Sequence, residues 1–300
     1  MNIYKKKKSK VLIIGFGSIG RKHFNILKKK NLEIKILSKQ NINKKYLIKS
    51  KDVIKFNPDY VIISSVASEH LKHINFIENY LINKIVLIEK PLFTKYKKIY
   101  LKNNKYFVGY NLRFHPVIQY LKKKRLKPFF IQVNCYSFLP EWRSNIHYSK
   151  SNSAIKKKGG GVFLELSHEI DYLNWVFGKL KPINLLKKKI SNLKTNVDDI
   201  FICNALINKK ILCNISLNFF SKIKKREIFI YTKRETIHAD LMNNKIEIIK
   251  NKNKKILHWK KFDILKTYET EHQSLLQGRF KNFCSIAEAN EVLGLLKFTK

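Results

Sequence analysis

The start of the chain shows the change of hydrophobic period that marks a strand, a loop and a helix in succession. Val11 to Ile14 form an unbroken apolar run, the pattern of a strand buried on both faces of a parallel sheet. A glycine-rich loop follows, and apolar residues then recur at helical intervals as far as Leu27. This pattern predicts a buried strand joined by a tight loop to an amphipathic helix.

The same alternation continues through the first third of the chain. Residues 33–37, 58–64 and 84–88 are short apolar runs typical of buried strands. Residues 68–81 carry a helical apolar stripe, with Ser68 as a candidate N-cap. Strands that alternate with helices indicate a parallel sheet covered on both faces.

The pattern changes in the second half. From residue 183 to residue 259, short apolar runs alternate with Asn- and Lys-rich turns, and INKK and MNNK have the character of hairpin connections. Amphipathic helices are expected at 269–276 and 285–296. The sequence therefore predicts an α/β Rossmann domain over residues 1–117 and an α+β domain with a large, mostly antiparallel sheet over residues 118–300.

The glycine loop has the G-x-G-x-x-G spacing of dinucleotide-binding proteins. Gly15 would allow the tight turn, Gly17 would let the backbone approach a pyrophosphate, and Gly20 would let the helix lie close to the sheet. The N-terminal amides of the helix would then face the phosphate. The loop residues expected at the cofactor are Gly15, Phe16, Gly17, Ser18, Ile19 and Gly20.

The residues after the second predicted strand bear on which nicotinamide cofactor is used. Many NAD-binding folds have Asp or Glu there for the ribose hydroxyls, whereas a small residue beside a cation suits the 2′-phosphate of NADP. This chain has Ser38 and Lys39 and no carboxylate. The pattern favours NADP modestly over NAD, although Lys39 is equally consistent with a solvated lysine.

Other candidate cofactor contacts follow the third and fourth strands. Ligands of open α/β sheets bind beyond the carboxyl ends of the strands, and Glu89 and Lys90 stand at such an end. Pro91 restricts the backbone at Lys90 and is a candidate for a cis bond. Ser65 and His70 follow the preceding strand, where His70 fits a cofactor contact and a structural role equally well.

The charge of the chain raises a competing interpretation. It has 62 Lys and Arg against 21 Asp and Glu in 300 residues, a formal net charge of +41. A basic surface can bind nucleic acid, but such binders more often show clustered arginine and a recognisable module. Here the excess is almost entirely lysine spread along the chain, so no specific nucleic-acid partner is expected.

Neither a metal site nor a membrane association is expected. The four cysteines have no C-x-x-C spacing and no matched histidines, and Cys203 and Cys213 fall in neighbouring apolar runs typical of buried thiols. No run reaches membrane-spanning length, and the basic N-terminus leads directly into the first strand without a signal sequence. These features indicate a cytoplasmic protein.

Several motifs together resemble the glucose-fructose oxidoreductase, inositol dehydrogenase and rhizopine catabolism family of NAD(P)-dependent sugar oxidoreductases. They are GFGSIGRKH, PDYVIIS, IEKPL, YFVGYNLRFHPVI and the segment 139–178, so the resemblance covers almost the whole chain. Residues 139–178 are similar to the branch found in bacterial surface-sugar pathways. The resemblance implies a sugar substrate, a large sheet that covers the active site, and pairing of subunits as a homodimer or homotetramer.

A second group of candidate residues lies after three consecutive glycines, Gly159 to Gly161. Glu165, His168 and Asp171 recur every three residues and would lie on one helix face, where burial is costly without a purpose. A solvated face is the alternative. In the resembled family this segment supplies a carboxylate and a histidine beside the nicotinamide. Many members separate those two by four residues, so Glu165 departs from that spacing, while His168 and Asp171 match the family's H-x-x-D.

These observations lead to a mechanistic hypothesis. Moving a hydride between nicotinamide and a sugar carbon also requires a proton to move to or from the sugar hydroxyl. His168 is expected to exchange that proton and Lys90 to stabilise negative charge on the oxygen. Glu165 and Asp171 would orient His168 or bind neighbouring hydroxyls. The candidates for the sugar or an attached phosphate are Arg113, Trp142, Arg143 and Tyr148.

The sequence alone leaves three other functions open. The first is a cofactor-binding sensor or scaffold of the same fold that has lost turnover. The second is an S-adenosylmethionine methyltransferase, whose fold also begins with a strand, a glycine loop and a helix. The third is a nucleic-acid binder, whose DNA binding would survive physiological salt. The Glu-Lys-Pro motif at the fourth strand favours the oxidoreductase.

Overall fold

The structure, a computed structural model, describes residues 8–40 and 42–298. The first sheet has six strands: five parallel strands from residues 9–109, and the edge strand β14 from the C-terminal part of the chain, which runs antiparallel to β5. The order across this sheet is β14 (Cys284–Ser285), β5 (Lys105–Gly109), β4 (Ile85–Glu89), β3 (Tyr60–Ile63), β1 (Ser9–Ile14) and β2 (Leu32–Leu37). The Rossmann-type sheet predicted from the sequence is confirmed.

Strand β1 is buried on both faces, as its unbroken apolar run predicts. Val11 and Ile13 pack in one cluster with residues of α1 (Ser18–Leu27) and α7 (Leu265–Leu276). Leu12 and Ile14 pack on the opposite side with residues of α2 (Val53–Phe56) and α3 (His70–Tyr80). Alternate side chains of a strand point to opposite faces, so a run of four apolar residues serves both layers.

The second part of the chain forms an eight-stranded sheet. All neighbouring strands in it are antiparallel except β6 and β9, which are parallel. Its order is β13 (Asn253–His258), β12 (Lys245–Lys250), β11 (Thr236–Asp240), β10 (Phe220–Thr232), β6 (Pro128–Phe138), β9 (Ile211–Asn218), β8 (Ile200–Ile207) and β7 (Leu180–Lys188). The predicted large, mostly antiparallel sheet is confirmed.

The INKK hairpin has the backbone that its sequence predicts. Asn208 and Lys209, between β8 and β9, have φ angles of 50° and 61°. Two successive positive φ values match the twist of the flanking strands, and asparagine tolerates this conformation well. The strands on either side therefore stay in register from Ile200 to Ile207. Cys203 and Cys213 are fully buried in these strands, as expected.

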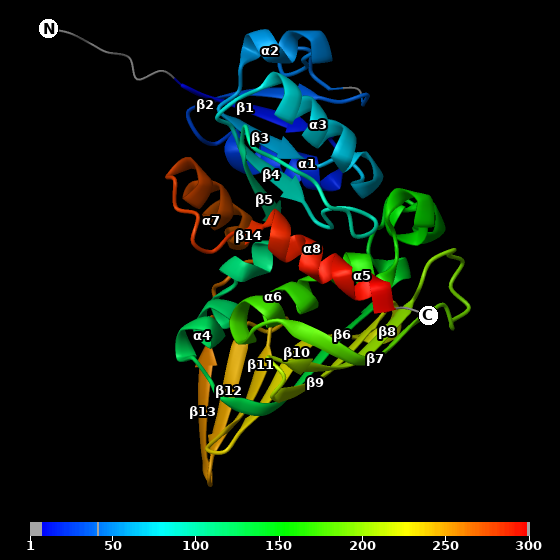
Figure 1. The fold of residues 1–300 in the computed structure, drawn as a ribbon, viewed down its shortest axis with the longest axis vertical. Helices are drawn as coiled ribbons and strands as arrows, with labels where there is room; N and C mark the ends of the chain where they lie inside the picture. The colour runs from blue at the N-terminus through cyan, green and yellow to red at the C-terminus, as the bar shows by residue number, and fades with distance from the viewer. Residues whose placement is uncertain (1–7, 41, 299–300) are drawn as a thin grey trace, which may run out of the picture.

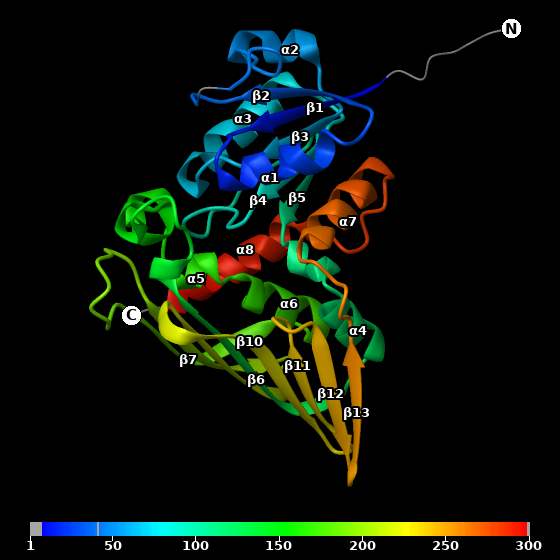
Figure 2. The same cartoon turned by 180° about the vertical axis from the view of Figure 1, so that it is seen from behind.

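Three helices lie between the two sheets and separate them into layers. Figures 1 and 2 show α5 (Val162–Glu165), α6 (His168–Phe177) and α8 (Ile286–Gly294) in this position, with α4 (Pro116–Lys124) beside them. Along β8, every second residue is buried and the others are partly exposed. One face of the large sheet is therefore covered by helices, while the other face is open.

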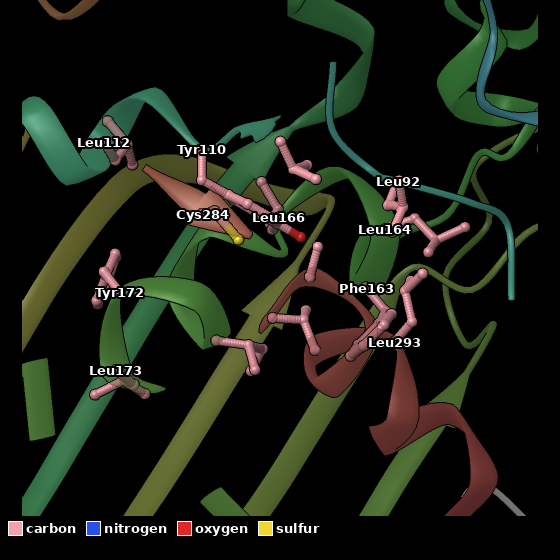
Figure 3. Close-up of a cluster of buried hydrophobic side chains, with 14 of the residues drawn as sticks. Leu92, Tyr110, Leu112, Phe163, Leu164, Leu166, Tyr172, Leu173, Cys284 and Leu293 are labelled. Atoms are coloured by element: carbon pink, nitrogen blue, oxygen red, sulfur yellow. The ribbon is translucent and has the colours of Figure 1, made fainter. Parts of the chain in front are cut away.

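A mixed apolar core joins the two parts of the chain. Figure 3 shows Leu92 and Tyr110, which follow strands of the first sheet, in one cluster with Phe163 of α5, Tyr172 of α6 and Leu293 of α8. All five side chains are less than 2% exposed. This continuous core fixes the loops at the ends of β4 and β5 against α5 and α6.

The C-terminal part of the chain returns to the first sheet. Helix α7 packs near α1 through Leu275, and β14 pairs with β5 through Cys284 and Ser285. Ser285 then caps α8 by accepting a hydrogen bond from the amide of Glu288, whose carboxylate accepts one from the Ser285 amide. The boundary predicted at residues 117/118 leaves out this return of the chain.

Candidate functional site

The glycine loop between β1 and α1 has the geometry of a phosphate cradle. A Cβ on Gly15 would lie 2.7 Å from the Ser65 amide nitrogen, and one on Gly20 would lie 2.3 Å from the Gly15 carbonyl oxygen. Packing within the protein therefore requires these two glycines. Gly17 is different, because nothing lies within 4 Å of the position of its Cβ and its φ of −69° suits any residue. The missing side chain leaves open space at the N-terminus of α1.

A cavity lies next to this loop, at the carboxyl ends of β1 and β2. Its volume is about 630 Å³, and Gly15, Ser38, Lys39 and Ser65 help to line it. The Ser65 hydroxyl is buried and has no hydrogen-bond partner in the described part of the chain, so it is available to a group that enters the cavity. Lys72 adds a second ammonium group to the lining. The open loop, the cavity and the free hydroxyl fit a dinucleotide.

Lys90 and Glu165 meet although they are far apart in the sequence. The Lys90 ammonium donates one hydrogen bond to the Glu165 carbonyl oxygen at 2.8 Å and another to its carboxylate at 3.1 Å. The other carboxylate oxygen accepts a bond from the Ser153 hydroxyl at 2.6 Å. Because an ammonium group has three N–H bonds, one of them remains for a ligand. The bond between Lys90 and Pro91 is cis.

The charge of Glu165 is stabilised by this arrangement. Burial alone would raise the pKa of Glu165, but the Lys90 ammonium and the Ser153 hydroxyl outweigh it and hold the pKa below its ordinary value. Sequence reasoning missed Ser153, because a serine in a loop carries no signal of its partner. The side chains of Lys90 and Glu165 are 16% and 21% exposed, so the pair is open to a small ligand.

The predicted single helix face at Glu165, His168 and Asp171 is interrupted. Helix α5 ends at Glu165 and α6 begins at His168, because the backbone leaves helical geometry at Leu166. The Ser167 hydroxyl donates a hydrogen bond to the carbonyl of Leu164, which stabilises the break. Glu165 and His168 therefore belong to two helices instead of one continuous face.

His168 is buried near Lys90. Its ring packs edge-on against Tyr110, with 5.4 Å between the ring centroids, and its Nδ1 has no hydrogen-bond partner. Burial, followed by the positive charges of Lys90 and Arg226, holds the pKa of His168 well below its ordinary value. The imidazole is therefore neutral at physiological pH.

Arg113 and Asp171 form a buried structural pair. The guanidinium donates hydrogen bonds to both oxygens of Asp171 at 2.7 to 3.2 Å, and another to the Phe283 carbonyl at 3.0 Å. Glu288 lies 3.1 Å from the same guanidinium. Arg113 is 1% exposed and Asp171 is 2% exposed. Neither side chain is exposed in this structure, so the pair is placed for a structural role, and the substrate and catalytic roles expected for Arg113 and Asp171 stay predictions.

The other three candidates for the substrate lie together. Trp142, Arg143 and Tyr148 line one recess with Ser153, the residue that binds the Glu165 carboxylate. Arg143 is exposed, while Trp142 and Tyr148 are half-buried. The structure thus brings these residues to the neighbourhood of Glu165.

His70 has a backbone carbonyl oxygen within hydrogen-bond distance of each ring nitrogen, and a neutral ring donates to one of the two. Nδ1 lies 3.0 Å from the carbonyl oxygen of Leu92, and Nε2 lies 3.0 Å from that of Ser65. Burial lowers its pKa, and the ring is 1% exposed. Of the two roles open at the sequence level, the structure supports the structural one: His70 joins the loop after β3 to the loop that follows Lys90.

Glu89 is also buried, and its carboxylate points away from solvent. One oxygen lies 2.8 Å from Nε2 of His23, and the other accepts a hydrogen bond from the Lys90 amide at 3.2 Å. Glu89 therefore supports the backbone of Lys90. Within residues 8–40 and 42–298, no group of three His, Cys, Asp or Glu residues could hold a metal ion, and no helix is long and apolar enough to cross a membrane.

No protein-family model and no curated protein sequence matches this chain, but many solved structures share its fold. The UDP-N-acetylglucosamine 3-dehydrogenase GnnA from Acidithiobacillus ferrooxidans superposes with a TM-score of 0.75 at 15% identity, covering 97% of each chain. The WlbA dehydrogenase from Bordetella pertussis, solved with NADH and UDP-GlcNAcA, gives 0.73 at 14% identity, covering 97% of this chain and 95% of that one. An NAD binding oxidoreductase from Klebsiella pneumoniae gives 0.79 at 13% identity, covering 98% and 96%.

These similarities establish the fold over nearly the full length of each chain. The protein has the fold of these dehydrogenases and oxidoreductases, a Rossmann-type sheet together with a large, mostly antiparallel sheet. Fold alone does not define a reaction, which depends on the residues of the site. The site combines a dinucleotide-type loop, a charged lysine with a free N–H, and a neutral buried histidine.

Proposed function

We propose that this protein is an NAD(P)-dependent oxidoreductase that transfers a hydride between nicotinamide and a carbon of a sugar. The observation that carries the proposal is the Lys90 ammonium, which Glu165 holds with one N–H left for a ligand. It stands at the carboxyl end of β4, the edge of the sheet at which dinucleotides bind in open α/β folds.

The residues divide the chemistry between them. Bound nicotinamide would accept or supply the hydride. Lys90 would donate a hydrogen bond to the sugar oxygen and stabilise the negative charge that develops there. His168, neutral because burial and nearby cations lower its pKa, would accept the hydroxyl proton during oxidation and return it during reduction. Glu165 would hold Lys90 in place.

The substrate class that fits best is a nucleotide-linked or acidic sugar. Arg143 is an exposed guanidinium beside the recess, and Trp142 and Tyr148 are half-buried aromatic residues next to it. GnnA is named as a UDP-N-acetylglucosamine dehydrogenase, and WlbA was solved with a UDP-sugar, which supports the same class here. We infer a role in bacterial surface-polysaccharide or glycan biosynthesis in the cytoplasm.

The cofactor cavity favours NADP modestly. Lys39 and Lys72 both line it and can neutralise a 2′-phosphate, whereas the second strand ends without a carboxylate. Glu69 is also in the lining and opposes this preference. The structure of WlbA contains NADH, so NAD is the alternative that a direct comparison of the two cofactors must decide.

We further infer a homodimer or homotetramer that pairs through the open face of the large sheet. Phe130 and Tyr231 stack on neighbouring strands, with 5.6 Å between their centroids, and Leu212 beside them is 44% exposed. Contiguous apolar groups on an open sheet favour association. Light scattering on the purified protein measures the oligomeric state, and a monomer would overturn this inference.

The function is tested by turnover of the purified enzyme on a panel of UDP-linked sugars and their free counterparts, followed by NAD(P)H absorbance. The proposal predicts turnover of at least one UDP-sugar, with a steep loss of kcat in Glu165→Gln because Lys90 loses its charged partner. Glu141→Gln, which changes an exposed carboxylate near the same recess, is the matched control. Cofactor binding without turnover on any sugar would favour the sensor or scaffold instead.

A further inference from the structure

Four buried polar side chains form a continuous hydrogen-bonded relay near the edge of the first sheet at which we propose that the cofactor binds. The Tyr60 hydroxyl lies 3.0 Å from Nδ1 of His272, and Nε2 of His272 lies 2.9 Å from Nδ1 of His23. Nε2 of His23 lies 2.8 Å from a Glu89 carboxylate oxygen. The two histidines are 0% exposed, Tyr60 is 2% exposed and Glu89 is 6% exposed. The relay begins at Tyr60 on β3, passes through His272 of α7 and His23 of α1, and ends at Glu89 of β4.

The hydrogen-bond donors and acceptors in this relay can be arranged in two ways. A neutral imidazole has one N–H donor and one bare nitrogen acceptor, so two neutral histidines in series must point their hydrogens in the same direction. If Tyr60 donates to His272, then His272 donates to His23, and His23 donates to an ionised Glu89. If Glu89 is protonated, every hydrogen bond is reversed and Tyr60 becomes the final acceptor.

The groups around the relay favour the first arrangement, in which Glu89 is ionised. The second oxygen of Glu89 accepts the Lys90 amide, and the positive charge of Lys22 acts on the same carboxylate. Glu271 is buried without a hydrogen-bond partner, and burial, followed by the Glu89 charge, raises its pKa well above the ordinary value, so it stays neutral. Burial is the main cause that lowers the pKa of His272, which keeps that ring neutral.

Glu89 connects this relay to the proposed catalytic lysine. Its carboxylate occupies a slot beside Gly109, where a Cβ would lie 3.1 Å from one of its oxygens. From that slot it accepts the amide of Lys90, the residue whose side chain reaches Glu165. A carboxylate that rotates would release this amide, and one that becomes protonated would accept it more weakly, because hydrogen bonds to an ionised acceptor are the stronger ones. The orientation of Glu89 therefore bears directly on the position of Lys90.

We propose that His23, His272 and Tyr60 are positioning residues that keep Glu89 ionised and oriented against the Lys90 backbone. The inference deepens the proposed function, since it matters for turnover only if Lys90 acts on the substrate. His23 and Tyr60 stand within the segments that suggest a dinucleotide fold, whereas His272 comes from the C-terminal return of the chain. Because His272 belongs to α7, the relay makes the proposed cofactor-binding edge of the first sheet depend on α7.

The first test uses ¹⁵N NMR of the histidine rings in the wild-type protein and needs no substrate. The relay predicts that both His23 and His272 are neutral and carry their hydrogen on Nε2 between pH 6 and pH 8, the range in which an unperturbed histidine titrates. A hydrogen on Nδ1 of His23 at neutral pH would overturn it. This result stands whether or not the protein turns over a sugar, so failure of the relay is separable from failure of the proposed function.

The second test is the pH profile of turnover in variants of His272. In His272→Leu the donor to His23 is lost, so Glu89 should protonate more readily and the acid limb of kcat/KM should move up by about one pH unit. His272→Gln should restore the wild-type limb, because its amide nitrogen can donate in place of Nε2. A purely structural role would lower the melting temperature of both variants and leave the limb unmoved, which would overturn the proposal. If His272→Leu does not fold, Tyr60→Phe tests the same shift in the same direction.

Discussion

The Lys90 ammonium lies 2.8 Å from the carbonyl oxygen of Glu165 and 3.1 Å from its carboxylate. Lys90 follows β4 of the first sheet, and Glu165 ends α5, which lies between the two sheets (Figure 1). Their contact joins the cofactor side of the site to the substrate side. A pair of opposite charges that remains partly exposed is suited to a group that must also bind a ligand.

Lys90→Ala should retain cofactor binding and lose turnover. The substitution removes the donor to the sugar oxygen, and groups of this kind contribute about 10²- to 10⁴-fold to rate. The measurement is kcat alongside the dissociation constant of the reduced cofactor. Lys95→Ala, which changes an exposed lysine five positions along the chain, is the control and should behave as wild type. Equal turnover in the two variants would rule out the role of Lys90.

Asp171→Asn should act on stability instead of on turnover. Removing one charge of a buried, doubly hydrogen-bonded pair leaves the Arg113 guanidinium without its counter-charge, which costs about 3 to 5 kcal/mol of unfolding free energy. Urea unfolding measures this loss. The folded fraction should keep nearly the wild-type kcat, and a large fall in kcat with unchanged stability would support the catalytic role expected from the sequence.

The pair formed by Arg113 and Asp171 shows how much of the site the sequence could predict. The glycine loop and Lys90 were predictable because a strand, its end and the following turn are local features. The role of Asp171 was not, because its spacing from His168 is helical whereas its partner Arg113 comes from a segment 58 residues earlier. The sequence pattern predicts a continuous helix through Glu165 because nothing in the sequence marks the break at Leu166. The return of α7 and β14 to the first sheet depends on long-range packing, which the hydrophobic periodicity of the sequence does not report.

Acid should destabilise the protein through its buried histidines. Burial lowers the pKa of His115 to about 4, while the unfolded chain has the ordinary value of about 6.5. Below about pH 6.5 the unfolded state binds more protons than the folded state, so stability falls as the pH falls and levels off near pH 4. His115 alone should account for about 3 kcal/mol of that loss.

Urea unfolding of His115→Gln at several pH values measures this contribution. The variant should show a shallower dependence on pH between about 6.5 and 4 than the wild type does. His147→Gln, which changes an exposed histidine, should leave the wild-type slope unchanged. Parallel curves for wild type and His115→Gln would mean that His115 does not titrate on unfolding.

Lys39→Ala should weaken NADPH binding more than NADH binding. Lys39 lines the cofactor cavity, and losing one charged contact to a 2′-phosphate should cost about tenfold or more in affinity. Lys29→Ala removes an exposed lysine from the end region of α1 and controls for the general change in charge. An equal effect of Lys39→Ala on both cofactors would remove the reason to favour NADP.

The central claim is that the loop between β1 and α1 binds a dinucleotide, and Gly17 offers the most direct test of it. Among the described residues, no neighbouring atom lies within 4 Å of the position of a Cβ at Gly17, so Gly17→Val should fold with the wild-type melting temperature. Gly294→Val, at the end of α8, fills another open position and serves as the matched control.

The measurement is a fluorescence titration of the wild type and these two variants with NADH and NADPH at physiological salt. We expect the wild type and Gly294→Val to bind at least one cofactor, and Gly17→Val to bind it at least about 100-fold more weakly because its side chain fills the phosphate position. Binding of either cofactor that is unchanged in Gly17→Val, or no binding of either cofactor by the wild type, would contradict the account.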